Sequence, residues 1–202
     1  MYNLSYFKTT DPQQVIRFME EHPFAMLMGV GKDKLPVATQ VPVFLDERDG
    51  QPVLTGHMMR QTDHHKAFLE NPDALMVFTG PHTYISASWY PDPLQASTWN
   101  YMSVHVRGKI SFLDEGSLLE ILERTTNHFE RNPDAFSSIP DEYIQRMVGA
   151  IVAFELKVEK VEHVFKLSQN KDPQTFQAIL SQLDKGDANA IAVASEMRSV
   201  KR

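Results

Sequence analysis

The stretch of sequence that decides the fold runs from Trp99 to Leu113 and reads WNYMSVHVRGKISFL. Polar and charged side chains alternate in it with apolar ones, Tyr101, Ser103, His105, Arg107 and Lys109 against Met102, Val104, Val106 and Ile110. A period of two is typical of a β-strand with one buried face and one solvated face. The alternation therefore predicts a strand of an antiparallel sheet along this stretch.

Shorter extended stretches flank this strand on both sides. Two runs of turn-forming residues, Gly31–Lys34 and Asp46–Gly50, separate the first three of them and predict two consecutive hairpins. Gly80-Pro81 is expected to end one strand before the next begins, because proline cannot donate to a strand ladder. The expected strands cover residues 24–30, 35–45, 52–57, 74–78, 82–88, 151–158 and 161–165.

Helices are expected between the strands and towards the C-terminus. Thr10-Asp11-Pro12 and Asp172-Pro173 each join a capping side chain to a proline in the first turn, which is typical of helix starts. Further helices are expected over residues 62–70, 116–129 and 141–149. Six or seven short strands with three helices inserted between them predict a mainly β, α+β fold, a small antiparallel barrel with peripheral helices. We expect one domain over residues 1–202, with residues 172–202 as a C-terminal helical extension.

The composition narrows the class of protein. The 202 residues contain no cysteine, which excludes a disulfide framework, cysteine-ligated zinc and a thiol nucleophile. The first twenty residues lack the apolar centre of a secretion signal, and no apolar run approaches the ~20 residues of a membrane span. We therefore expect a cytoplasmic protein with no membrane contact. The net charge of −6 argues against a free-standing nucleic-acid binder, which usually carries a basic face.

The histidines do not predict a metal site. His64 and His65 are neighbours on an expected helix and project in different directions, so we expect them to be solvated rather than to share an ion. The other candidates stand singly in or near strands, where structural hydrogen bonding is the better interpretation. These are His57, His82, His105 and His163.

Aromatic rings and hydroxyl groups gather in residues 80–90 and 97–101, which contain both tryptophans. Flat rings beside hydrogen-bond donors suit a planar polar ligand. The alternative is an aromatic corner of the core whose hydroxyls bond to the backbone. Four basic residues flank this segment, and each is either a surface charge or, if the ligand carries a phosphate, one of its partners. They are Arg60, Lys66, Arg107 and Lys166.

Four segments of the chain closely resemble signatures of the PaiB family, the FMN-binding negative transcriptional regulators of bacteria. They are residues 80–90 (GPHTYISASWY), 98–101 (TWNY), 104–108 (VHVRG) and 166–170 (KLSQN). The start of the chain and Gly56-His57 are also similar to that family, so the resemblance runs essentially end to end. One departure is Gln61–Lys66, where the family often shows a run similar to Asn-Pro-Gln-Trp-Arg.

The resemblance implies an FMN-binding split β-barrel of the flavin-reductase and pyridoxamine-phosphate-oxidase type. It also implies a homodimer with FMN in clefts at the subunit interface. We expect the flavin to lie against the second and third strands and the aromatic segment of the partner chain.

The FMN phosphate is a dianion, and burying it even partly requires cationic donors. Arg60 and Lys66 stand where a strand gives way to a helix, whose first amides would add to them, and Arg107 is the reserve. No catalytic residue and no metal ligand is assigned. The expected cofactor-binding residues are Thr39, Gln40, Val41, His57, Arg60, Lys66, Tyr84, Ser86, Trp89, Trp99, Asn100, Arg107, Lys166 and Gln169.

Three functions follow from these observations. The first is an FMN-binding negative transcriptional regulator, a repressor that acts through DNA or a regulatory protein partner. The second is an FMN-dependent oxidoreductase, since a flavin supplies the chemistry and the protein need only bind and orient. The third is a haem-binding relative with His57 or His163 as axial ligand. The one dense basic run, Arg198–Arg202, is either a DNA contact or a solvated terminus, and we favour a binder over an enzyme.

Overall fold

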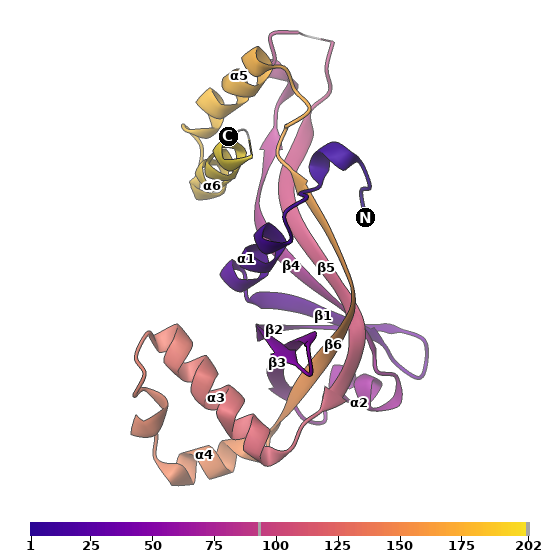
Figure 1. Ribbon diagram of the computed structural model, residues 1–202, viewed down its shortest axis with the longest axis vertical. Helices are drawn as coiled ribbons and strands as arrows, with labels where there is room; N and C mark the ends of the chain where they lie inside the picture. The colour runs from indigo at the N-terminus through magenta and orange to yellow at the C-terminus, as the bar shows by residue number, and fades with distance from the viewer. Residues whose placement is uncertain (93, 201–202) are drawn as a thin grey trace. The chain divides into compact units, whose positions relative to one another are not determined.

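The computed structural model describes residues 1–92 and 94–200 and contains an antiparallel barrel and several helices (Figure 1). Within the described residues, the strands are β1 (Phe24–Val30), β2 (Pro36–Arg48), β3 (Gln51–Met59), β4 (Asp73–Ile85), β5 (Thr98–Phe112) and β6 (Ile151–Lys166). The helices are α1 (Pro12–Glu21), α2 (Asp63–Glu70), α3 (Glu115–Glu130), α4 (Asp141–Val148), α5 (Pro173–Leu183) and α6 (Ala188–Ser199).

The barrel closes in the strand order β1-β2-β3-β6-β5-β4. β1 pairs antiparallel with β2 and with β4, and β3 pairs antiparallel with β2 and with β6. The consecutive hairpins β1-β2 and β2-β3 are the predicted meander (Figure 1). The prediction of an α+β split barrel with peripheral helices is confirmed.

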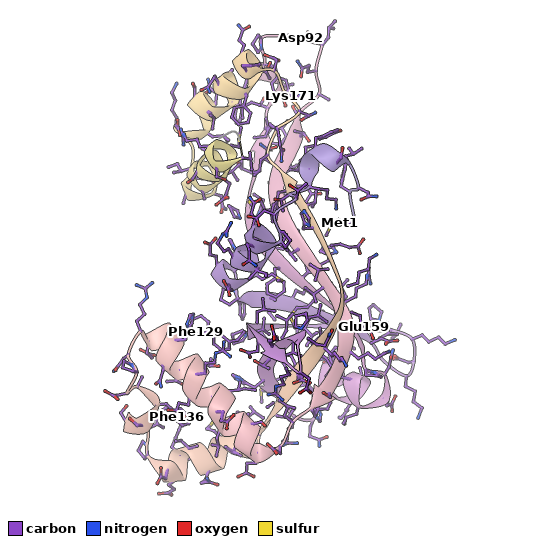
Figure 2. The ribbon with its side chains drawn as sticks, viewed as in Figure 1. Met1, Asp92, Phe129, Phe136, Glu159 and Lys171 are labelled. Carbon is purple, nitrogen blue, oxygen red and sulfur yellow. The ribbon has the colours of Figure 1, made fainter. Side chains whose placement is uncertain are left out.

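Two predicted strand breaks are wrong. β4 continues through Gly80-Pro81, and β6 continues through the polar residues around Glu159, whose side chain is exposed (Figure 2). β1 pairs only with Leu75–Val77 of β4, so beyond Val77 no ladder to β1 is lost, and a proline is tolerated on such an edge. Gly80-Pro81 therefore does not end the strand, because the proline lies where β4 has no ladder to β1 that it could interrupt.

The chain forms two compact units. The barrel unit comprises residues 19–78 and 105–161, and the terminal unit comprises residues 1–18, 79–104 and 162–202, of which 93 and 201–202 lie outside the described residues. β4, β5 and β6 contribute residues to both units. The expectation of one domain with a helical extension at 172–202 stays a prediction, although α5 and α6 do occupy Pro173–Leu183 and Ala188–Ser199.

Each unit has its own apolar core. In the barrel unit Leu27, Leu54, Met76 and Phe154 are almost fully buried. A second cluster forms where α3 and α4 meet the start of β6, and it contains Leu118, Ile121, Val148, Ile151 and Ala153. In the terminal unit α5 packs against α6, and the buried side chains include Phe165, Leu167, Phe176, Ile179, Val193 and Met197.

Candidate functional site

The expected cofactor residues on β2 and β3 face different ways. Gln40 is exposed and pairs with Met26 of β1, whereas Thr39 and Val41 pair with the buried Leu27 and Ala25. Paired residues of neighbouring strands share a face, so Thr39 and Val41 point towards the barrel interior. Val41 is 5% exposed, and only its backbone is available to a ligand.

Where Phe24–Val30 of β1 pairs with residues 36–42 of β2, the outward face is almost wholly apolar. Its eight positions alternate with buried or half-buried residues, and Gln40 is the only polar side chain among them. Phe24, Met26 and Val30 are 58%, 40% and 41% exposed. The face carries no charge, and its members are Phe24, Met26, Met28 and Val30 of β1 and Pro36, Ala38, Gln40 and Pro42 of β2.

The ring of His57 on β3 is a candidate to hydrogen-bond a ligand. Its Nδ1 atom is buried and has no hydrogen-bond partner among the described residues. Burial lowers the pKa of His57 below its ordinary value, which favours the neutral ring. A neutral imidazole with an unpartnered nitrogen can accept from a ligand or donate to it, depending on the tautomer.

Arg60 and Lys66 flank the start of α2 in the barrel unit. The Arg60 Nε atom donates to the carbonyl of Ile151 at 2.7 Å, which anchors the base of the guanidinium and leaves its terminal nitrogens exposed. Lys66 is exposed and lines a shallow surface hollow. Both cations are therefore placed to meet an anion from solvent.

The first amides of α2 are already engaged by the chain's own side chains. The hydroxyl of Thr62 accepts from the amide of His65 at 3.3 Å, and a carboxylate oxygen of Asp63 accepts from the amide of His64 at 2.8 Å. Asp63 also places a negative charge in the first turn. The helix amides are thus less available to a phosphate than the sequence suggested, and the role of Arg60 and Lys66 in such a site stays a prediction.

His65 is buried rather than solvated, contrary to the expectation from sequence. Its ring lies 4.9 Å from the ring of Phe112, and its Nδ1 atom accepts from the amide of Gln61 at 3.3 Å. Burial lowers its pKa, and the charges of Arg60, His64 and Lys66 lower it further. The helix turns His65 inward and leaves the His64 side chain, 12% exposed, beside Asp63, so the two rings do part as predicted.

In the terminal unit, rings of β4 and β5 gather on one exposed surface. Trp99 is 52% exposed and Tyr84 is 47% exposed. The Trp99 ring lies 6.1 Å from the Tyr84 ring and 6.0 Å from the His82 ring. These three rings form a stacking surface, so the interpretation of an aromatic corner buried in the core does not apply to them.

Other expected residues of the aromatic segment serve local structure. Ser86 caps the short 3-10 helix Ala87–Trp89 and accepts from the amide of Ser88 at 3.2 Å. Trp89 lies in that turn and is half-buried. Tyr90, which follows, is buried, and the Lys171 ammonium lies 4.7 Å from its ring centre. Lys171 was not among the expected residues, although it is a basic residue directly after the KLSQN segment.

Asn100 and Gln169 are engaged inside the terminal unit. Asn100 is fully buried, accepts from the Ser168 hydroxyl at 3.0 Å and donates to the Met197 sulfur at 3.4 Å. Gln169 accepts from the amide of Leu167 at 2.7 Å and donates to the carbonyl of Phe165. The KLSQN segment is a tight turn, with Ser168 in the left-handed region at a φ of 61°.

Lys166 and Arg107 occupy contrasting positions. Lys166, in the terminal unit, is half-buried and donates to the hydroxyl of Thr98. Burial and then the charge of Lys171 lower its pKa. Arg107, in the barrel unit, is exposed on β5.

The expected cofactor-binding residues are divided between the two units. The barrel unit holds Thr39, Gln40, Val41, His57, Arg60, Lys66 and Arg107. The terminal unit holds Tyr84, Ser86, Trp89, Trp99, Asn100, Lys166 and Gln169.

Neither a metal centre nor a membrane segment emerges from the described residues. Across residues 1–92 and 94–200, no three His, Cys, Asp or Glu side chains are grouped as metal ligands. In the same part of the chain, no helix has the length and apolar character needed to cross a membrane.

Residues 1–160 match the family described as "Putative FMN-binding domain". The chain is 32% identical over 186 residues to the Protease synthase and sporulation protein PAI 2 of Bacillus subtilis, covering 91% of this chain and 89% of the relative. It is also 23% identical over 245 residues to an uncharacterized protein of Aspergillus fumigatus, covering 92% and 94%.

Two solved structures share the fold at low sequence identity. The flavocytochrome Anf3 of Azotobacter vinelandii gives a TM-score of 0.58 at 16% identity, covering 88% of this chain and 78% of that one. The FAD and heme binding protein of Mycobacterium smegmatis gives a TM-score of 0.51 at 16% identity, covering 84% and 78%. At such identities the likeness concerns the fold alone.

Proposed function

The chain belongs to the family of PaiB-type FMN-binding domains, and from this premise we propose that it is an FMN-binding homodimer that acts as a negative transcriptional regulator. The proposal rests most on one observation, the uncharged apolar face of β1 and β2 that carries Gln40. On that face Gln40, an expected flavin contact, is surrounded by apolar side chains whose exposure to water is unfavourable.

We propose that a second copy of the chain covers this face. Monomeric proteins rarely leave a continuous apolar patch in water, and seven of the eight outward positions here are apolar. A two-fold interface brings the same patch of both subunits together, and an uncharged patch brings no like charges into contact. Gln40 would then be the one side chain of this face able to hydrogen-bond to a ligand at the interface.

The residues present fit a flavin mononucleotide. In the barrel unit His57 offers an unpartnered buried nitrogen, and Arg60 and Lys66 offer cations for a phosphate. The stacking surface of Trp99 and Tyr84 would come from the second copy of the chain. When bound, FMN supplies redox chemistry that the side chains do not. The task of these residues is to bind and orient it and to neutralise its phosphate.

A regulatory role is supported by the Bacillus subtilis relative, whose name refers to protease synthesis and sporulation. We place the regulatory contact in a protein partner rather than in the basic C-terminal run. Arg198 of that run binds both carboxylate oxygens of Asp184 at 2.7 Å, and Lys201 and Arg202 lie outside the described residues. This contact engages the described end of the run with a carboxylate of the chain itself.

The test compares Met26→Glu with Ile191→Glu, an equivalent change at a 50% exposed position of α6. Light scattering should give a dimer for the parent chain and for Ile191→Glu, and a monomer for Met26→Glu. The visible spectrum should show bound FMN only in the two dimers. A parent chain that is monomeric, or that takes up no FMN, overturns the proposal, and steady NADPH oxidation by the holoprotein would assign it to the oxidoreductases instead.

A further inference from the structure

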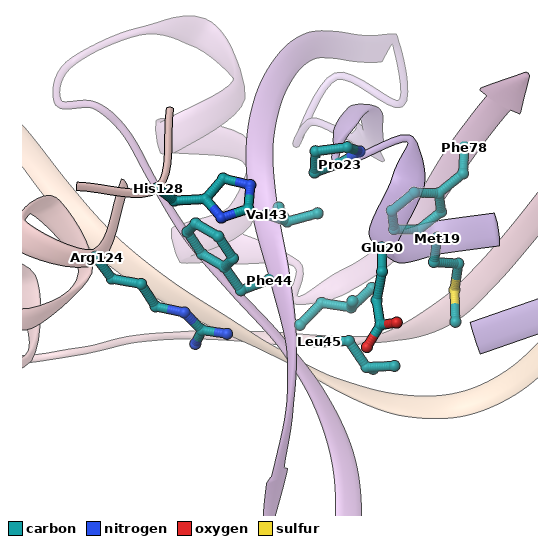
Figure 3. A pocket seen from close by; sticks show the side chains of 10 residues that line it. Met19, Glu20, Pro23, Val43, Phe44, Leu45, Phe78, Arg124 and His128 are labelled. Atoms are coloured by element: carbon teal, nitrogen blue, oxygen red, sulfur yellow. The ribbon is translucent and has the colours of Figure 1, made fainter. Parts of the chain in front are cut away.

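A pocket separate from the expected cofactor-binding residues lies wholly within the barrel unit, between α1, β2 and α3 (Figure 3). Its volume is about 240 Å³, and its floor is apolar, formed by Val43, Leu45, Leu54 and Phe78. Pockets for drug-sized ligands usually measure ~300–1,000 Å³, so this one suits a smaller molecule than FMN. At roughly 30 Å³ per water molecule, it takes about eight waters, which is the size class of a single amino acid.

The acidic wall of this pocket is Glu20 of α1. Its carboxylate is exposed at the rim and has no ion pair or hydrogen bond with any described residue. Figure 3 shows the side chain reaching from the helix towards Leu45. A free carboxylate above an apolar floor is a site for an ammonium group.

The basic wall is formed by Arg124 and His128, one turn apart on α3. The Arg124 guanidinium lies 4.1 Å from the ring centre of Phe44, and His128 packs edge-on against the same ring at 5.4 Å (Figure 3). The Arg124 Nη1 atom binds both oxygens of Asp46, at 2.7 and 2.8 Å. Its other nitrogens donate to no described residue, and the ring nitrogens of His128 likewise have no hydrogen-bond partner in residues 1–92 and 94–200.

We propose that this pocket binds a small apolar α-amino acid of the leucine class. Glu20 would accept from the α-ammonium group, Arg124 and His128 would donate to the α-carboxylate, and the side chain would lie on the apolar floor. The carboxylate of Glu20 on one wall and the unused guanidinium and imidazole nitrogens on the other match a zwitterion, whereas a simple acid or a simple amine leaves one wall unpaired. Phe44 holds the guanidinium and the imidazole from below, which reduces the entropy lost when they bind a carboxylate.

Matched ligands on the unaltered holoprotein give the first test. By calorimetry, L-leucine should bind at least tenfold more tightly than 4-methylpentanoate, which lacks the ammonium group, and than leucinamide, which lacks the carboxylate. Equal affinity for all three, or no heat from L-leucine at millimolar concentration, overturns the proposal. FMN binding is read separately by the visible spectrum, so failure here and failure of the proposed flavin site are distinguishable.

A pair of variants gives the second test. Glu20→Gln should weaken L-leucine at least tenfold and leave 4-methylpentanoate unchanged, because only the ammonium contact is lost. Glu21→Gln, the next residue of α1 and outside the pocket lining, should leave both unchanged. Glu20 is exposed, so its replacement should preserve the unfolding midpoint. If Glu20→Gln binds L-leucine as the parent chain does, the assignment of this pocket is wrong.

Discussion

The two units use their outward strand surfaces in opposite ways. The barrel unit presents an uncharged aliphatic and phenyl face on β1 and β2, whereas the terminal unit presents Tyr84 and Trp99, rings with polar edges. An aliphatic face gains most when another protein surface removes it from water. A surface of polar-edged rings can stack a planar ligand while its edges remain hydrated. On our proposal, the same two-residue period serves association in one unit and ligand stacking in the other.

The largest expected effect breaks the barrel unit. A Cβ atom on Gly108 of β5 would lie 2.0 Å from the carbonyl oxygen of Lys157 on β6. Gly108→Ala therefore forces the strands apart, and we expect a loss of about 3 kcal/mol or more in the free energy of unfolding, measured in urea. Gly116→Ala, in the first turn of α3, meets nothing closer than 3.6 Å and should stabilise by about 0.5–1 kcal/mol. Equal stability of the two variants would show that the close strand approach is not required.

The next effect breaks the terminal unit. Asn100→Ala removes the acceptor of the Ser168 hydroxyl and the donor to Met197 at a fully buried position. We expect a loss of about 2 kcal/mol in urea unfolding, because a buried hydroxyl is left without its partner. Asn170→Ala, exposed two residues after Ser168, should stay within about 0.5 kcal/mol of the parent chain. If Asn100→Ala lowers the free energy of unfolding only slightly, its hydrogen bonds are not needed for the fold, and the predicted role in cofactor binding is favoured instead.

Much of the fold was predictable because its signals are local. Alternation over Trp99–Leu113 predicted β5, and capping residues predicted the starts of α1 and α5 within a residue. The closure of the barrel and the unbroken course of β4 were not predictable in this way. They depend on which strands pair with each other, and the paired strands lie far apart in the sequence. The roles of the candidate residues were harder still. Trp99 and Asn100 are consecutive residues of β5 and point to opposite faces of the sheet, so Asn100 is fully buried and Trp99 is half exposed.

A comparison of two ligands sharpens the assignment of the barrel unit. Arg60→Ala should weaken FMN about ten- to a hundredfold and riboflavin little, since a charge-assisted hydrogen bond to a phosphate contributes about 1.5–3 kcal/mol and riboflavin has no phosphate. Arg60→Lys keeps the charge while removing the Nε contact to Ile151, and it should retain most of the FMN affinity. Equal weakening of both ligands by Arg60→Ala would make Arg60 a structural residue. Fluorescence titration measures both constants.

The corresponding test of the terminal unit is smaller. Trp99→Ala should weaken FMN about fivefold, because a stacked aromatic ring contributes about 1 kcal/mol beyond its buried area. Trp99→Phe should recover most of this loss. Tyr143→Ala, at a similarly exposed position of α4 in the barrel unit, should leave FMN binding unchanged. If all three variants bind FMN alike, the stacking surface serves another ligand.

The smallest effect is a dependence of stability on pH that both units share. His65 in the barrel unit and His163 in the terminal unit each accept a backbone hydrogen bond through a ring nitrogen, from the amides of Gln61 and Thr9. Protonation of that nitrogen breaks the bond. Burial lowers the pKa of both rings below the ordinary value of 6.5, aided by the charges of Arg60 and Lys8 respectively.

The sign follows from proton uptake on unfolding. Below pH 6.5 the unfolded chain binds more protons at these histidines than the folded chain, so the free energy of unfolding should fall as the pH drops through 6.5. The fall should level off below the lowered pKa values, where both states are protonated. Arg60→Gln removes one of the charges that lower the pKa of His65, so it should raise that pKa, followed by NMR, and shrink the fall. Lys8→Gln should do the same at His163 alone, and an effect of either variant on the distant ring would contradict this assignment of each charge to one unit.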